Sequence, residues 1–255
     1  MDAPASPAQW PGVPPFYRQP AVLDGDRHRN HGLLPDARYG FAAESTAIVI
    51  GVGEFMPALR HYPIVFTDAA DPMPVAVTGL TRGRNLFVSS EGTWRPQHYV
   101  PGYLRRYPFI LSPSADGETA TLLVDEACPR FVDSSRHRHA TRLFDDAGDA
   151  AAAAQEVMAF CHTAHQEQQR TVAFARALRE AGLLAPRNVQ IRTPGGGQHA
   201  VDGFQLVEEE KFRALRGPIL EAWQARGWLD AIALHLVSQQ NWLPLGELQD
   251  QRRGR

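Results

Sequence analysis

YVPGYLRRYPFIL, at residues 99–111, repeats a pattern that occurs upstream in EFMPALRHYPIVF, at residues 54–66. Each stretch joins a short helical turn with cationic side chains to a Tyr-Pro step, and then to an apolar run. Because the proline ring disfavours the helical conformation of the residue before it, we expect Tyr62 and Tyr107 to be extended. The helix must therefore end before each proline, and a strand begins after it. The chain is predicted to contain two such helix–Tyr-Pro–strand units.

The rest of the sequence before residue 148 is typical of short strands. Residues 46–52, 75–80 and 121–125 are rich in apolar and β-branched side chains and are bounded by turn residues. Because little room is left for long helices, these strands predict a mostly antiparallel sheet. Residues 1–20 are rich in Pro and Ala and are predicted to form a flexible arm.

Helical periodicity begins after Gly148. Apolar residues recur at helical spacing over Val157–Leu183, which predicts one long helix or a broken pair. Residues 189–206 are predicted to form a small hairpin around a glycine run, and three short helices are expected within residues 208–240. Residues 246–255 are predicted to form a polar tail.

The predicted fold class is α+β. A mostly antiparallel, strand-rich N-terminal part with two helix–Tyr-Pro–strand units is followed by a helical C-terminal part with a small hairpin. The predicted divisions are the flexible arm at 1–20, a strand-rich subdomain at 21–148, a helical subdomain with the hairpin at 149–245, and the tail at 246–255. The alternative is that the late hairpin rejoins the sheet, which would then cross the boundary near residue 148.

The composition bounds the functions to consider. The formal net charge of the 255 residues is −2, which gives no reason to expect a nucleic-acid partner. Cys128 and Cys161 lie far apart in the sequence and predict neither a disulfide framework nor a structural zinc site. The N-terminus lacks the features of a Sec signal peptide, and no run approaches about 18 apolar residues. We therefore expect no membrane span and a cytoplasmic protein by default, with the cell surface reached only by a non-Sec route.

Arginine and aromatic residues gather around the two Tyr-Pro steps. If the two units are related by a local pseudo-twofold axis, these side chains line one groove. Guanidinium groups beside aromatic rings suit carboxylates, phosphates or an extended peptide. The alternative is that the arginines pair with nearby acids while the tyrosines fill the core. The predicted ligand-binding residues are Glu54, Arg60, His61, Tyr62, Trp94, Arg105, Arg106 and Tyr107.

Histidines are the candidate metal ligands. His137 and His139 would share one face of a strand, because alternate residues of a strand point the same way. Arg136 and Arg138 would repel a divalent cation there, so the alternative is a solvated basic loop. The sequence predicts no cofactor; an enzyme, the alternative, would use iron or zinc at His28, His137 and His139.

Known catalytic motifs are missing from the sequence. No Gly-x-Ser-x-Gly, His-Glu-x-x-His or Walker sequence occurs, so the common hydrolase and NTPase classes have no motif support. The Gly51-Val-Gly53 turn begins a dinucleotide-binding pattern, but Met56 stands at the third glycine position. Whether the chain is an enzyme stays open on these grounds.

Further motifs follow one another along the chain. The YPIVF block at residues 62–66 and the RRYPF block at residues 105–109 are the most specific. They are accompanied by Asp26-Arg-His28, Glu54-Phe55, Gly79-Leu80, Asn85-Leu-Phe87, Trp94, Tyr99-Val-Pro-Gly-Tyr103, Leu143-Phe144-Asp145, Glu210-Lys211 and Ser238. This order resembles the SapC family of bacterial proteins over nearly the whole chain.

The resemblance implies an accessory or binding protein, associated with the surface layer by the family label. It would hold a peptide or protein partner through the Arg/Tyr groove. Members often occur beside genes for flavin-dependent tryptophan-halogenase-like proteins, cupin-like proteins and TonB-dependent receptors. The resemblance therefore implies association with a halogenase-like protein or a TonB-dependent receptor. The alternative is an enzyme, either a metal-dependent oxygenase or a partner of the halogenase-like proteins. The resemblance carries over no catalytic residues.

Overall fold

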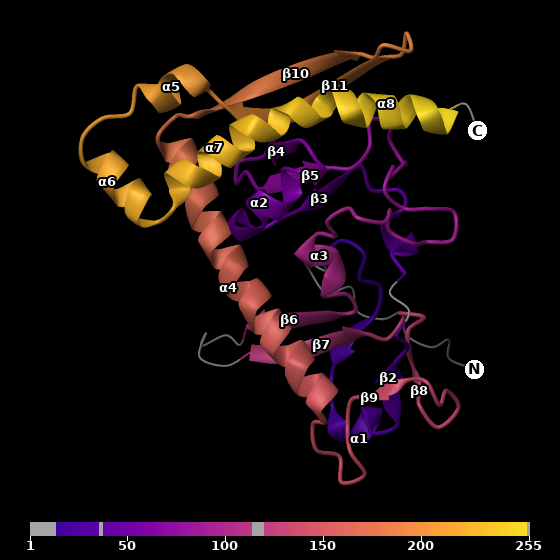
Figure 1. Ribbon diagram of the computed structural model, residues 1–255. Helices are drawn as coiled ribbons and strands as arrows, with labels where there is room; N and C mark the ends of the chain where they lie inside the picture. Colours follow the sequence, from indigo (N-terminus) through magenta and orange to yellow (C-terminus); the bar gives the residue numbers. More distant parts are fainter. Residues whose placement is uncertain (1–13, 36–37, 114–119, 254–255) are drawn as a thin grey trace, which may run out of the picture. The chain divides into compact units, whose positions relative to one another are not determined.

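The computed structural model describes residues 14–35, 38–113 and 120–253 (Figure 1). Within this part of the chain the fold is α+β, as predicted, and the paired strands are antiparallel. Two compact units are present: the first combines the described residues before position 36 with residues 106–162, and the second combines residues 38–105 with the chain from Thr163 onward. Helix α4, Ala152–Glu180, is one continuous helix and contributes residues to both units.

The first unit contains two three-stranded antiparallel sheets. One has the strand order β1-β7-β6 and the other has the order β8-β2-β9. The short helix α1 begins after Asp24, whose carboxylate accepts hydrogen bonds from the backbone N–H groups of Asp26 and Arg27. The elements are β1 Pro20–Val22, α1 Gly25–His28, β2 His31–Leu33, β6 Phe109–Pro113, β7 Ala120–Asp125, β8 Phe131–Asp133 and β9 Thr141–Arg142.

The second unit is built on a five-stranded antiparallel sheet with the order β10-β11-β4-β5-β3. Its strands are β3 Ala47–Val49, β4 Ile64–Thr67, β5 Pro74–Val77, β10 Leu184–Arg192 and β11 Gln198–Val207. The late hairpin of β10 and β11 rejoins the early strands, because Phe204 of β11 lies opposite Thr67 of β4. The sheet therefore combines strands from before and after residue 148, which is the alternative that the sequence left open.

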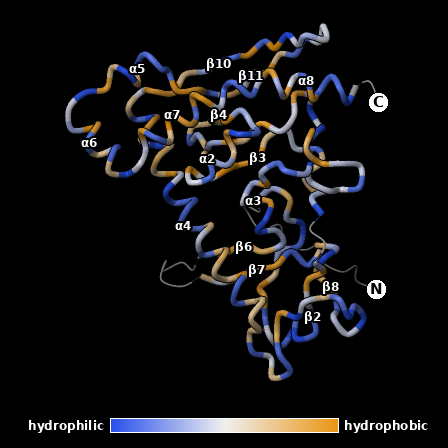
Figure 2. Tube along the Cα trace, in the orientation of Figure 1, coloured by the Kyte–Doolittle hydropathy of each residue, from blue (hydrophilic) through white to orange (hydrophobic). Residues whose placement is uncertain are grey.

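Helices pack on this sheet around a core of large apolar side chains. Phe55, Tyr62, Phe66 and Phe174 are fully buried, and Figure 2 shows apolar residues concentrated along β4 and α7. Of the helices in this unit, α7 Trp228–Ser238 contacts β4 and β11, and α8 Trp242–Arg253 contacts β10. The others are α2 Phe55–Ala58, α3 Gly102–Arg105, α5 Glu209–Arg213 and α6 Pro218–Ala225, with 3-10 turns η1 Gly40–Ala42, η2 Val52–Glu54 and η3 Gln239–Asn241. In the described parts of the chain, no helix combines the length and apolarity needed to cross a bilayer.

Both predicted helix–Tyr-Pro–strand units are present. In the first, α2 is followed by Tyr62-Pro63, and β4 begins at Ile64. In the second, α3 is followed by Tyr107-Pro108, whose peptide bond is cis, and β6 begins at Phe109. Proline has no N–H to continue a helix, so each helix ends and the chain becomes extended after it.

The start of β4 is held by side chains at the end of α7. The Ser238 hydroxyl accepts the N–H of Ile64 at 3.0 Å, and the Gln239 side-chain amide donates to the carbonyl of Ile64 at 2.8 Å. The Asn241 side-chain amide donates to the carbonyl of Tyr62 at 3.0 Å. Buried backbone groups need hydrogen-bond partners, and here side chains from the C-terminal helices supply them.

Helix α8 occupies most of the segment predicted as a polar tail. The segment is helical because Leu245 and Leu248 share a buried face. Near the far end of the helix, Asp250 accepts hydrogen bonds from His199 Nε2 at 2.9 Å and from the Thr193 hydroxyl, both in the late hairpin. The Asp250 carboxylate therefore fixes α8 to the hairpin.

A buried carboxylate fixes the described end of the N-terminal segment in the first unit. Asp125 is fully buried. It accepts hydrogen bonds from the backbone N–H of Arg18 at 3.0 Å, from that of Gln19 at 2.7 Å, and from the Tyr107 hydroxyl at 3.0 Å. The predicted arm at residues 1–20 otherwise falls largely outside the described residues.

We expect Asp125→Ala to lower the free energy of unfolding by about 3 kcal/mol, because three backbone N–H groups, those of Arg18, Gln19 and Ala127, and the Tyr107 hydroxyl lose their acceptor. Chemical denaturation followed by circular dichroism measures this. Asp146→Ala is the control, because that carboxylate is 93% exposed in its ion pair with Arg142, and its loss is expected to stay below about 0.5 kcal/mol. Equal losses in the two variants would contradict the assignment.

Burial of His235 predicts acid sensitivity in the second unit. His235 Nε2 accepts the backbone N–H of Val207 at 3.1 Å, and burial lowers the pKa of His235 to about 4. The unfolded chain binds a proton here below pH about 6.5 while the folded protein does not, so stability present above pH 6.5 is lost as the pH falls toward 4.

We expect this residue to contribute a loss of about 3 kcal/mol between pH 7.5 and 4. Denaturant titrations at both pH values measure it. His235→Gln offers an acceptor without a titrating ring, and its stability is expected to depend less on pH than that of the wild type. An unchanged pH dependence in this variant would refute the role of His235.

Candidate functional site

The predicted ligand-binding residues are distributed over both compact units. Glu54, Arg60, His61, Tyr62, Trp94 and Arg105 belong to the second unit, and Arg106 and Tyr107 belong to the first. Within each unit, most of these side chains are engaged in internal contacts, which are described next. Their role in ligand binding stays a prediction.

Glu54 joins the beginnings of two helical segments. Its carboxylate accepts hydrogen bonds from the Gly51 N–H at 2.7 Å, the Gly102 N–H at 2.6 Å and the Tyr99 hydroxyl at 2.7 Å. Arg105 Nη2 donates to the same Tyr99 hydroxyl at 3.1 Å. Burial, followed by the Glu54 charge, raises the pKa of Tyr99. The structure thus brings Glu54 and Arg105 together around Tyr99, where they fix η2 and α3.

Tyr62 and Trp94 lie together in the interior of the second unit. The Tyr62 hydroxyl donates to the carbonyl of Tyr99 and accepts a hydrogen bond from Trp94 Nε1 at 3.3 Å. Burial raises the pKa of Tyr62, so the phenol is a neutral hydrogen-bonding group at physiological pH. Phe87 packs against Tyr62 with ring centroids 4.7 Å apart. These contacts stabilise the core next to the start of β4.

Tyr107 has an equivalent internal role in the first unit. Its hydroxyl donates to Asp125, and its ring packs edge-on against Tyr17 at 5.4 Å. Burial, followed by the nearby Cys128 and Asp125, raises the pKa of Tyr107. Burial raises the pKa of the Cys161 thiol to about 11, and the positive charge of Arg106 opposes this increase.

The candidate metal ligands lie in different settings of the first unit. His28 is buried; its Nδ1 accepts the Asp24 N–H at 3.1 Å, and its Nε2 donates to Glu126 at 2.9 Å. His137 and His139 are exposed in the segment between β8 and β9. In the residues that the structure describes, no three His, Cys, Asp or Glu side chains are grouped closely enough to hold a metal ion. Iron or zinc binding stays a prediction.

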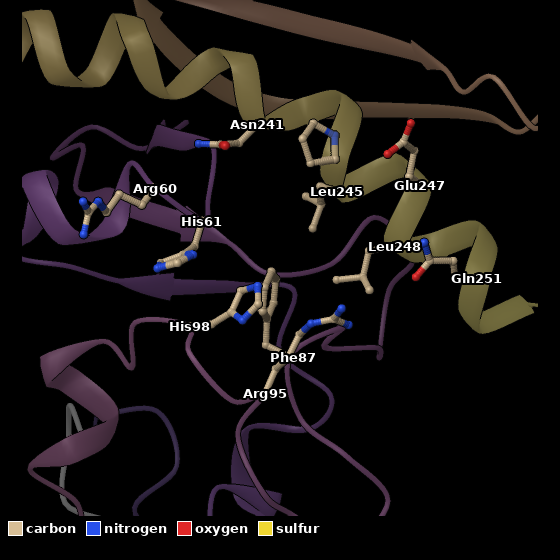
Figure 3. Close-up of a pocket in the computed structure, with 11 residues that line it drawn as sticks. Arg60, His61, Phe87, Arg95, His98, Asn241, Leu245, Glu247, Leu248 and Gln251 are labelled. Atoms are coloured by element: carbon tan, nitrogen blue, oxygen red, sulfur yellow. The ribbon is translucent and has the colours of Figure 1, made fainter.

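A cavity of about 250 Å³ lies in the second unit (Figure 3). One wall comes from the segment between α2 and β4, a second from the segment between β5 and α3, and a third from α8 with the preceding turn η3. Its lining combines basic, amide and apolar side chains with one acidic side chain. These residues are Arg60, His61, Phe87, Arg95, His98, Asn241, Pro244, Leu245, Glu247, Leu248 and Gln251.

Two imidazole rings face each other in this cavity. The ring centroids of His61 and His98 are 4.8 Å apart, at an angle of 43°. His98 Nδ1 lies 2.8 Å from the carbonyl of Pro96. Because a carbonyl can only accept, Nδ1 carries the proton and Nε2 holds the lone pair of the neutral ring. Burial, the charge of His98 and the charge of Arg60 together lower the pKa of His61.

Cationic side chains in the cavity lack carboxylate partners. Among the described residues, neither Arg60 nor Arg95 forms an ion pair, and both are exposed. Figure 3 shows the Arg95 guanidinium turned toward Leu248, while the carboxylate of Glu247 points away from the imidazole rings. The cavity therefore offers a positively charged side and an apolar side to a ligand, which suits an organic carboxylate.

Sequence reasoning identified Arg60 and His61 but missed the rest of this cavity. The sequence predicted a polar tail where the structure has α8, and Leu245 and Leu248 of this helix form the apolar wall. The signals that were present are the i, i+3 spacing of these leucines and the Arg95-x-x-His98 sequence between the two Tyr-Pro units. Neither signal links the two segments in space.

We expect Tyr62→Phe to lower the free energy of unfolding by about 2 kcal/mol, because the Tyr99 carbonyl and the Trp94 N–H lose their buried partner. A double-mutant cycle with Trp94→Phe isolates the Tyr62–Trp94 hydrogen bond, with an expected coupling of about 1 kcal/mol. Strict additivity of the two substitutions in denaturation experiments would contradict this coupling.

Comparison with known proteins identifies the family. A sequence model of the SapC family matches residues 23–245. No curated protein and no solved structure matches the chain. Since the family match spans most of the 255 residues, the chain belongs to the SapC family.

Proposed function

We propose that this SapC-family chain is a binding protein that holds a carboxylate group of a peptide or protein partner in the cavity beside α8. The observation that carries the proposal is the Arg95 guanidinium, which lines the cavity without an ion pair among the described residues. A guanidinium group binds a carboxylate through two parallel N–H···O hydrogen bonds, and this pairing is favoured where water is partly excluded.

The size and lining of the cavity indicate how much of the partner enters. About 250 Å³ is below the roughly 300–1,000 Å³ typical of sites that enclose a drug-sized ligand. Phe87, Leu245 and Leu248 supply an apolar surface next to Arg95. A carboxylate with one adjacent aliphatic group, as at the C-terminus of a peptide or on an acidic side chain, matches this combination.

This proposal retains part of the predicted Arg/Tyr groove. Arg60 and His61 line the cavity, while Tyr62 is buried and packs against Phe87, which also lines it. The partner classes that the family resemblance implies, halogenase-like proteins and TonB-dependent receptors, are the candidates from which a carboxylate-bearing segment would come.

The test uses N-acetyl-leucine, which carries one carboxylate and one aliphatic side chain, and its carboxamide as the neutral counterpart. We expect calorimetry to show binding of N-acetyl-leucine in the millimolar range and binding of the amide at least about tenfold weaker, because only the carboxylate pairs with Arg95. Arg95→Gln is expected to weaken binding of N-acetyl-leucine about tenfold or more.

Arg82→Gln is the matched control. Arg82 is also exposed in the second unit but does not line the cavity, so its removal is expected to leave the affinity unchanged. Equal binding of acid and amide, or an Arg95→Gln variant with the affinity of the wild type, would overturn the proposed function.

A further inference from the structure

The pair of histidines in the cavity has a consequence for the ligand. We propose that the cavity takes up one proton together with its carboxylate, and that the His61–His98 pair holds this proton. The inference rests on the proposed function, because it concerns the same site and the same class of ligand. It assigns the two histidines a binding role and makes the affinity for the carboxylate increase as the pH falls.

Before a ligand binds, the charged side chains closest to the pair are mostly cationic. His61 lies next to Arg60 in sequence, and Arg95 lines the same cavity from the segment that carries His98. From α8, the one acidic residue that lines the cavity is Glu247, whose carboxylate points away from the rings in Figure 3. A proton on either ring would therefore face a surplus of positive charge without an opposing anion.

A bound carboxylate reverses this balance. An anion within hydrogen-bond distance of an imidazole favours its protonated form, because the opposite charge offsets the cost of desolvation. The His98 Nδ1–H is already donated to Pro96, so the added proton goes to His98 Nε2 or to His61. In either case the new N–H can donate to the ligand carboxylate, beside the guanidinium of Arg95.

The geometry limits the uptake to about one proton. With ring centroids 4.8 Å apart, two imidazolium ions would repel each other, so a second proton is disfavoured once one ring carries a proton. Proton and carboxylate binding are linked reciprocally: if the carboxylate increases proton affinity, protonation increases carboxylate affinity by the same factor.

Calorimetry with N-acetyl-leucine at pH 7 in two amine buffers of different ionisation enthalpy, Tris and bis-Tris, tests the inference. Cationic buffers are chosen because buffer anions would compete for the cavity. We expect the measured binding enthalpy to differ between the buffers, corresponding to an uptake of between about 0.3 and 1 proton. The affinity is expected to rise about tenfold from pH 7.5 to pH 5.5.

Two variants locate the proton. His98→Asn retains an amide donor toward the carbonyl of Pro96 but removes the titrating ring, and His61→Gln removes the other ring. The variant carrying both substitutions is expected to show no buffer dependence and a binding affinity that changes less than about twofold between the two pH values. His162→Gln is the control, because that histidine is exposed on α4 outside the cavity, and it is expected to behave as the wild type.

The outcomes separate the two proposals. Binding of N-acetyl-leucine without buffer dependence in the wild type would overturn the proton-uptake inference and leave the proposed function standing. Proton uptake that persists without both rings would also overturn it, because another group would then hold the proton. No binding at any pH would overturn the proposed function itself. The comparison of buffers with the wild type tests proton uptake even if the double variant does not fold.

Discussion

The hydrogen bonds at Ile64 connect the beginning of β4 to the end of α7, which lies more than 170 residues later in the chain. Pro63 cannot donate to a neighbouring element, and the chain changes there from helix to strand, so backbone groups around this point need partners from elsewhere. Ser238 and Gln239 satisfy both the N–H and the carbonyl of Ile64. Because β4 lies between β11 and β5 in the sheet, fixing its first residue also fixes where the C-terminal helices lie on the sheet.

The cavity depends on that attachment. Asn241, two residues after Gln239, donates a hydrogen bond to the carbonyl of Tyr62. This contact places the start of α8 next to the segment that contains His61. The internal hydrogen bonds of Tyr62 hold this segment from the other side. The tyrosine of the first Tyr-Pro step thus acts mainly through the backbone that it positions, and its neighbours in sequence line the cavity together with α8.

The fold class and the two helix–Tyr-Pro–strand units could be predicted from the sequence. Proline chemistry predicted where the short helices end and where β4 and β6 begin, and periodicity predicted α4, because these are local effects within a few residues. The composition of the last residues favoured a tail, yet α8 forms because two leucines find a buried surface far away in sequence. Local patterns contain no information about such a surface.

The candidate site likewise combines residues with a local sequence signal and residues that only folding brings together. Arg60 and His61, beside the first Tyr-Pro step, were predicted from the sequence as binding residues, and both line the cavity. Arg95 and His98 lie more than 30 residues from His61 and about 150 residues from α8, a separation that only folding brings together. Glu54 and Arg105 carried the same chemical signal but are used internally around Tyr99, which residue type alone does not reveal.

Helix α8 is clamped at both of its ends: Asn241 holds the turn before it, and Asp250 binds Thr193 and His199 near its other end. The apolar wall of the cavity therefore exists before any ligand arrives. The proposed ligand would therefore meet a preformed surface and lose little affinity to ordering of the protein. The rate of that binding would be set by how often the two molecules collide in the right orientation, because no slow rearrangement of α8 would have to precede it.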